Sequence, residues 1–215
     1  VYQPEKIGDI TEDLRALAPD LLVVMAYGQI LRKNILTLAS RAIINLHASL
    51  LPKYRGAACI QAAIDAGDSH TGITAMHVVR ELDAGDIILA KSIPIPPEET
   101  GGSLHDKLAD LAADVLTETL ELLENDTAPR IPQEPALVSY IPKLDREHGR
   151  IDWTMDAAAL ERRIRAYDPW PGTYTEAIEN GSPKRLKIHP PTAVVETSLS
   201  PGEVRIEANR LIVGC

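Results

Sequence analysis

The chain has 215 residues, enough for one domain of ordinary size or for one domain and part of a second. Hydrophobic residues make up 45% of it and charged residues 25%, which allows a packed core and excludes general disorder. Because 31 Asp and Glu outnumber 22 Lys and Arg, the net charge is −9, and the chain as a whole is not a basic nucleic-acid-binding protein. An aromatic content of 4%, without Phe, argues against a protein that binds single strands by stacking bases.

Disulfide-rich and membrane-spanning proteins are excluded as well. Cys59 and Cys215 are too few for a disulfide framework. The longest apolar run, residues 21–26, is far shorter than the roughly 20 residues of a membrane span. The composition therefore predicts a soluble α/β enzyme in a reducing compartment.

The first part of the chain predicts a buried α/β unit. Residues 8–18 and 31–39 have helical patterns, and residues 21–25 and 42–46 are continuous apolar runs of strand length. Such runs are typical of strands that are buried on both faces of a sheet. The order strand, helix, strand predicts a right-handed parallel crossover.

The remaining elements follow in chain order. Helices are predicted at 57–66, at 103–124 with Ser103 as N-cap, and at 156–167. Strands are predicted at 71–79, 87–95, 173–178 and 186–189, and the last two lie on either side of an Asn180-Gly181 hairpin signal. A further hairpin is predicted at 203–213. Residues 125–150 are rich in Pro and charge and are interpreted as a connector.

Polar residues stand where the second predicted strand ends. Asn45 and His47 are two positions apart, so both side chains point to the same side of the strand. An amide and an imidazole placed together can stabilise an oxyanion and pass a proton. Asp83, in a tight turn after another strand, is the best candidate to orient the histidine, and Asp86 is its competitor. The alternative is that Asn45 and His47 only form a turn.

Other catalytic patterns are weaker. His47, Ser49 and Asp83 could imitate a hydrolase triad, but the sequence has no G-x-S-x-G motif. The other histidines have no metal-ligand spacing, and His70 and His77 are interpreted as strand-surface groups.

Two motifs carry a resemblance to a known family. Asn45-Leu46-His47-Ala48-Ser49-Leu50-Leu51-Pro52-Lys53-Tyr54-Arg55-Gly56 and Leu82-Asp83-Ala84-Gly85-Asp86 resemble the signatures of the folate-dependent formyltransferases, and the similarity continues in Ile151-Asp152-Trp153 and in the run from Ile164 to Gly172. Cys59 departs from the pattern, since the family usually has a proline there.

The resemblance implies a fold and a domain organisation. It implies a Rossmann-like α/β formyltransferase domain, with a mostly parallel sheet and flanking helices, followed by the start of a small OB-like β-barrel domain. The domains would be a catalytic domain at 1–135, a linker with a connecting helix at 136–172, and the β domain from 173 to 215. Because the chain starts at Val1 and stops after an apolar run, it is interpreted as a fragment that lacks the N-terminal segment and most of the C-terminal domain.

The resemblance also implies substrates and a site. The formyl donor would be 10-formyltetrahydrofolate and the acceptor the amino group of methionyl initiator tRNA, with no metal, in a bacterial cytoplasm or an organellar matrix. The full-length protein would be a monomer that does not bind membranes. The implied catalytic residues are Asn45, His47 and Asp83, and the implied folate-binding residues are Ser49, Leu50, Leu51, Pro52, Tyr27, Gly28 and Ile30.

Several alternatives stay open. One is another formyltransferase of the same fold that acts on an amino-sugar nucleotide, or a hydrolase of formyltetrahydrofolate. Another is a silent folate-binding or RNA-binding relative. Two groups of basic residues are either solvated faces or contacts to tRNA phosphates: Arg162, Arg163 and Arg165, and Lys184, Arg185 and Lys187.

Overall fold

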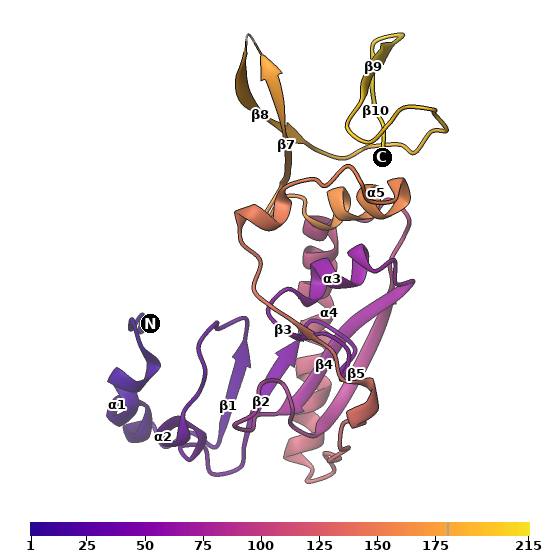
Figure 1. The fold of residues 1–215 in the computed structure, drawn as a ribbon. Coiled ribbons are helices and arrows are strands. Elements are labelled where there is room, and N and C mark those ends of the chain that lie inside the picture. Colours follow the sequence, from indigo (N-terminus) through magenta and orange to yellow (C-terminus); the bar gives the residue numbers. More distant parts are fainter. Residues whose placement is uncertain (180) are drawn as a thin grey trace. The chain divides into compact units, whose positions relative to one another are not determined.

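The computed structural model describes residues 1–179 and 181–215, and the chain forms two compact units (Figure 1). The first unit comprises Val1–Cys59, His70–Pro94 and Asp106–Lys143, and the second comprises Ile60–Ser69, Ile95–His105 and Leu144–Cys215.

A mixed four-stranded sheet forms the centre of the first unit. Its strands are β1 (Leu21–Met25), β2 (Ala42–His47), β4 (His70–His77) and β5 (Ile87–Pro94), in the order β1-β2-β4-β5. β1 and β2 are parallel and are linked through the short helix α2 (Lys33–Leu36), which confirms the predicted parallel strand pair. β4 runs antiparallel to β2 and to β5.

The α/β class is therefore confirmed, but the expectation of a mostly parallel sheet is wrong for the described strands. Among the four strands of this sheet, only β1 and β2 form a parallel pair. The link between β4 and β5, residues 78–86, contains no helix. Parallel neighbours need a crossover of a dozen residues or more, so this link allows only an antiparallel pair.

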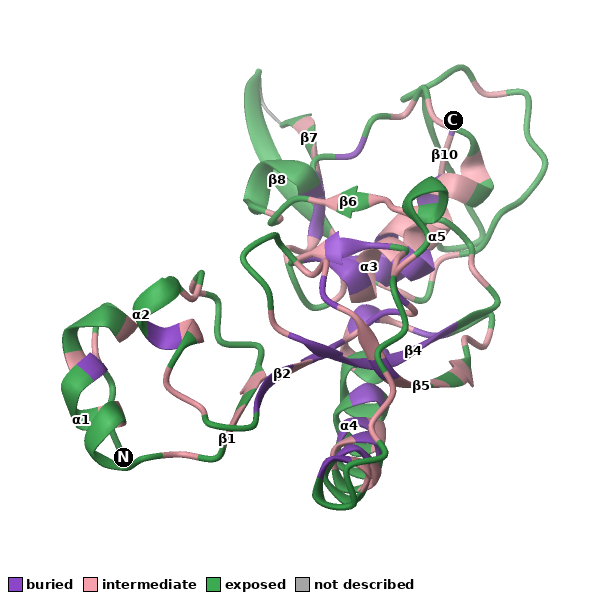
Figure 2. Ribbon diagram, turned by 90° about the horizontal axis from the view of Figure 1, so that it is seen from below, coloured by how far each residue is buried: buried purple, intermediate pink, exposed green. Residues whose placement is uncertain are grey.

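The strands differ in burial, as Figure 2 shows. β2 and β4 are buried along most of their length. β1 is partly exposed, with Val23 at 44% and Met25 at 45% of their full accessible area. The prediction that residues 21–25 are buried on both faces is wrong, because β1 lies at the edge of the described sheet, next to β2 alone.

Helix α4 (Gly101–Glu124) lies alongside β4 and β5 (Figures 1 and 2). Its buried residues share one face at helical spacing: Leu104, Leu108, Ala112, Val115, Thr119 and Leu123. The helix begins two residues before the predicted cap. The Thr100 hydroxyl accepts a hydrogen bond from the backbone N–H of Ser103, and the Ser103 hydroxyl accepts one from the N–H of Thr100. Thr100 therefore caps the helix, and Ser103 reciprocates from its first turn.

The other helices are short. The predicted helix at 8–18 consists of a 3₁₀ turn, Ile7–Ile10, followed by α1 (Thr11–Ala16). α3 covers Cys59–Asp65, and α5 covers Ala157–Ala166 with the Asp156 carboxylate as its N-cap. None of the described helices is both long and apolar enough to cross a membrane.

The second unit carries two hairpins. β7 (Thr173–Glu179) pairs with β8 (Ser182–Ile188), and β9 (Val204–Glu207) pairs with β10 (Arg210–Val213). Asn180, the first residue of the predicted hairpin signal, lies outside the described residues. A small core forms beside them from Ile151, Leu160 and Ile164, with Trp153, Met155 and Ile188 packed against it.

The basic residues of α5 stabilise this unit. Arg165 is buried, and its guanidinium bonds the Glu161 carboxylate and the backbone carbonyl of Glu99. Arg163 forms an ion pair with Asp65 at 3.0 Å, and Arg162 donates to the backbone carbonyl of Asp65. Neither sequence interpretation of these arginines, a solvated face or phosphate contacts, matches this internal role. In β8, Arg185 lies over the Tyr174 ring at 3.8 Å.

Candidate active site

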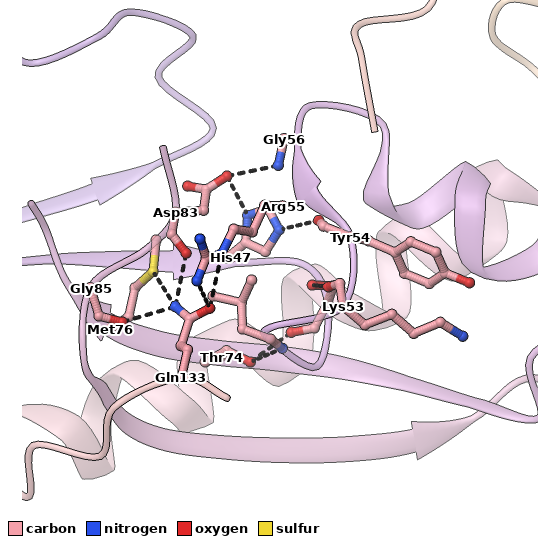
Figure 3. A network of polar contacts seen from close by, with 12 residues as sticks. His47, Lys53, Tyr54, Arg55, Gly56, Thr74, Met76, Asp83, Gly85 and Gln133 are labelled. Carbon is pink, nitrogen blue, oxygen red and sulfur yellow. Dashed lines mark hydrogen bonds and ion pairs between the residues drawn. The ribbon is translucent and has the colours of Figure 1, made fainter. Parts of the chain in front are cut away.

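Three segments of the first unit converge on His47 (Figure 3). The His47 loop, residues 47–56, follows β2, and the Asp83 turn, residues 81–86, lies between β4 and β5. The third is the 131–141 segment, which contains the short strand β6 (Tyr140–Ile141). β6 pairs with β3 (Arg55–Gly56) at the end of the His47 loop.

Both ring nitrogens of His47 are defined by their surroundings. The residue is buried, and Nε2 lies 2.8 Å from the backbone oxygen of Tyr54. A carbonyl can only accept, so Nε2 carries a hydrogen and donates it. Nδ1 faces the Asp83 carboxylate, with Oδ2 at 3.7 Å. In this tautomer Nδ1 carries the lone pair of the ring, on the side of the Asp83 carboxylate.

Asp83 is held by its backbone and by its carboxylate. Its φ of 48° places it in the left-handed region, which a tight turn requires here. Oδ2 accepts a hydrogen bond from the N–H of Gly56 at 2.8 Å. Asp86, the competing candidate, instead pairs with Arg130 at 3.7 Å. Of the two candidate aspartates of the turn, the structure brings Asp83 to His47.

Asn45 stands two positions before His47 on β2, on the same side of the strand. Its side chain is half-buried, and no hydrogen-bond partner for its amide is found among the described residues. An amide N–H beside an imidazole can donate to an oxygen that becomes negative during a reaction.

The predicted folate-binding residues of the His47 loop also shape the loop itself. Ser49 is buried and donates its hydroxyl hydrogen to the carbonyl of Lys53, at 2.6 Å. Thr74 of β4 accepts from the N–H of Leu51 and donates to the carbonyl of Ser49. Leu51 is buried as well, and Leu50 and Pro52 are half-buried. Sequence reasoning missed Thr74, a fully buried hydroxyl in the middle of β4.

The remaining predicted folate-binding residues lie in the β1 loop, residues 26–30. Because β1 and β2 are parallel, this loop and the His47 loop leave the same edge of the sheet. Tyr27 and Ile30 expose 39% and 76% of their area, and Gly28 has a φ of 75°. No hydrogen bond or ion pair among the described residues joins these three to Asn45, His47 or Asp83.

The 131–141 segment was missed by sequence reasoning, which treated it as part of a connector. Ser139 accepts from the N–H of Tyr54 with its hydroxyl and from the N–H of Arg55 with its carbonyl. Gly56 has a φ of 109°, and a Cβ at that position would lie 2.2 Å from the carbonyl oxygen of Ile141. Only glycine allows this approach. The segment therefore holds the end of the His47 loop. No local sequence pattern could have indicated this contact.

His77 corrects another expectation, since it is buried at the end of β4 and not on the strand surface. In the described part of the chain, its Nε2 has no hydrogen-bond partner. Burial lowers the pKa of His77 and Arg130 lowers it further, while Asp86 opposes them. Among the described residues, no three His, Cys, Asp or Glu lie close enough together to hold a metal ion.

Comparison with known families gives two matches that together cover most of the chain. Residues 3–120 match the formyl transferase family, and residues 143–215 match the C-terminal domain of formyl transferases.

The chain is similar to curated enzymes over most of its length. It is 50% identical over 220 residues to the methionyl-tRNA formyltransferase of Akkermansia muciniphila, covering 100% of this chain and 70% of that protein. It is 49% identical to the methionyl-tRNA formyltransferase of Moorella thermoacetica, covering 88% of this chain and 60% of that protein. The chain thus spans between 60% and 70% of the length of these two relatives.

Solved structures share the fold. HypX from Aquifex aeolicus, in complex with tetrahydrofolic acid, superposes with a TM-score of 0.73 at 23% identity, covering 98% of this chain and 36% of that protein. At this identity the likeness is evidence for the fold alone.

Proposed function

Because the chain belongs to the methionyl-tRNA formyltransferase family, we propose that it transfers a formyl group from 10-formyltetrahydrofolate to the amino group of methionyl initiator tRNA. The protein would thereby serve the initiation of translation. The observation that carries the proposal is the geometry of His47, held between the Tyr54 carbonyl and the Asp83 carboxylate. Beside it lies the Asn45 amide, which has no partner among the described residues.

The residues at this edge of the sheet fit a folate. Tyr27 and Ile30 offer exposed apolar surface in the β1 loop, which suits a flat aromatic ring system. Asn45, at the end of the neighbouring strand, offers an amide donor that no described residue occupies. The His47 loop, through Ser49 to Pro52, would form the other wall of the site.

The donor supplies a formyl carbon that is open to attack by an amine. As the new C–N bond forms, negative charge develops on the formyl oxygen, and Asn45 donates a hydrogen bond to it. His47 in its protonated form places a positive charge beside the same oxygen, and the Asp83 carboxylate orients the ring and stabilises that charge. The amine must lose a proton and the folate nitrogen must gain one as the old C–N bond breaks. His47 and Asp83 provide a path for that proton.

We also propose that this transfer uses no metal, because the amide hydrogen bond and the imidazolium charge supply the stabilisation that a Lewis acid would otherwise provide. The full-length protein is proposed to be a monomer in a bacterial cytoplasm or an organellar matrix. The division of the chain at residues 135 and 172 likewise stays a prediction.

A panel of acceptors tests the proposal. The intact protein is incubated with 10-formyltetrahydrofolate and with methionyl initiator tRNA, amino-sugar nucleotides or no acceptor, and Asn45→Ala is run beside it. We expect rapid formylation of the tRNA alone, and its loss in the variant. Preferred formylation of a sugar amine would identify the first alternative, and release of formate without an acceptor would identify a hydrolase. Binding of the folate without transfer to any acceptor would identify a silent relative.

A further inference from the structure

The side chain of Gln133 joins the two parts of the molecule that define His47 (Figure 3). Its Nε2 donates to the backbone carbonyls of Asp83 and Gly85, at 2.8 and 2.9 Å. Its Oε1 accepts from the Arg55 guanidinium, from Nε at 3.0 Å and from Nη2 at 2.7 Å. One amide therefore links the Asp83 turn to the end of the His47 loop.

The orientation of this amide is determined by its partners. The nitrogen faces two carbonyl oxygens, and the oxygen faces a cation. The reversed amide would set oxygen against oxygen and N–H against N–H. Arg55 is buried, and its Nη1 donates to the Tyr140 hydroxyl at 3.2 Å. Gln133 thus satisfies part of a buried guanidinium and both carbonyls of a strained turn, and its donors and acceptor are all used.

The contact matters because Asp83 has little other support. Its backbone is in the left-handed region, and its Oδ2 depends on the N–H of Gly56. Gln133 binds the side chain of Arg55, and the next residue, Gly56, binds the Asp83 carboxylate. Movement of either anchor would change the 3.7 Å between Asp83 Oδ2 and His47 Nδ1.

We propose that Gln133 is a positioning residue of the reaction, which sets the Asp83 carboxylate against His47 without touching a substrate. The inference rests on the proposed function. A displacement of about 1 Å in a catalytic group can cost up to about 100-fold in rate. Loss of Gln133 should therefore lower kcat by about 10- to 100-fold and leave KM for both substrates near its wild-type value.

The test compares Gln133→Ala, Gln133→Glu and Arg130→Gln in the intact protein. Gln133→Glu keeps an acceptor for Arg55 but loses the N–H groups that bind the Asp83 and Gly85 carbonyls. It therefore separates the loss of these donors from a loss of folding. Arg130→Gln is the matched control, since it removes a surface ion pair of the same stretch that points to Asp86. We expect both Gln133 variants to lose kcat and the control to keep it within about twofold.

A double-mutant cycle decides whether Gln133 acts through Asp83. In an Asp83→Asn background, Gln133→Ala should cost less than about twofold, because the interaction that it supports is already lost. A merely structural residue would cost the same in both backgrounds. Unchanged kcat in Gln133→Ala, or additive effects in the cycle, would overturn the inference.

A readout without turnover separates this inference from the proposed function. The ¹⁵N resonances of the His47 ring report its contact with the Asp83 carboxylate, and they should shift in the same direction in Gln133→Ala and in Asp83→Asn. If the wild-type protein formylates no acceptor, the proposed function fails, and the resonances still decide the positioning. Resonances that move in Asp83→Asn but not in Gln133→Ala would refute it.

Discussion

The β1 loop and the His47 loop leave the same edge of the sheet from neighbouring parallel strands, yet they differ in burial and in their hydrogen-bond partners. The His47 loop is tied down by Thr74 of β4, by Ser139 and by the Asp83 turn. The β1 loop exposes Tyr27 and Ile30.

The difference follows from strand position and suggests a division of labour. β2 has neighbours on both sides, so the loop after it meets polar groups from β4 and from the 131–141 segment, whereas β1 lies at the edge of the described sheet. Groups that move protons need fixed geometry, which the buried loop supplies. A loop with exposed apolar side chains instead supplies contact area for a ligand.

The largest expected effect is on catalysis, at the strand end that leads into the His47 loop. Asn45→Ala removes the proposed oxyanion donor, and the loss of one such donor typically costs about 10²–10³ in kcat. Formyl transfer under saturating substrates measures it. Asn34→Ala is the matched control, because the Asn34 amide donates to the Thr11 hydroxyl and to none of the proposed site residues, so its loss should affect stability alone. Full-rate transfer by Asn45→Ala would remove Asn45 from the site.

The second effect compares one glycine from each loop. Gly56→Ala introduces a Cβ that meets the Ile141 carbonyl at a φ of 109°, so the free energy of unfolding should fall by about 2–3 kcal/mol. Gly28→Ala, at a φ of 75° with nothing within 4 Å, should cost about 1 kcal/mol. Denaturant titrations of both variants provide the measurement. Equal losses would show that the His47 loop is no more tightly packed than the β1 loop.

The third effect tests the open side. Tyr27→Ala removes an exposed ring that would cover the folate, so KM for the donor should rise by about fivefold, while kcat changes little. Tyr2→Ala, which removes another exposed tyrosine, is the control. A fall in kcat with constant KM would show that Tyr27 acts in the chemical step and not in binding the folate.

The smallest effect concerns the base of the Asp83 turn, where the N–H of His77 donates to the carbonyl of Asp86. Burial lowers the pKa of His77 in the folded chain. Below about pH 6.5, the ordinary pKa of histidine, the unfolded chain therefore binds a proton at His77 while the folded chain keeps the ring neutral. The stability that the neutral ring contributes is complete above that pH and is lost as the pH falls towards the folded pKa. The melting temperature should therefore fall less steeply between pH 8 and pH 5 for His77→Leu than for wild type.

Identical slopes for His77→Leu and wild type would show that His77 titrates alike in the folded and unfolded chains.

Local pattern predicted much of this molecule. The continuous apolar runs at 21–25 and 42–46 are the parallel pair β1 and β2, and the period of 103–124 is the helix α4. The spacing of Asn45 and His47 placed both on one side of a strand end, because side chains alternate along any strand. The catalytic and folate-binding roles of these residues stay predictions.

Tertiary structure alone decided the rest. Neither the direction of β4 relative to β2 nor the exposure of β1 can be read from a single strand, because both depend on which strands become neighbours. The same holds for the burial of His77 and for Gln133, whose partner Asp83 is 50 positions away in the sequence. A strand or helix records its own buried face in its residue pattern. A hydrogen bond between distant segments leaves no periodic signal, since it requires only one donor and one acceptor that the fold brings together.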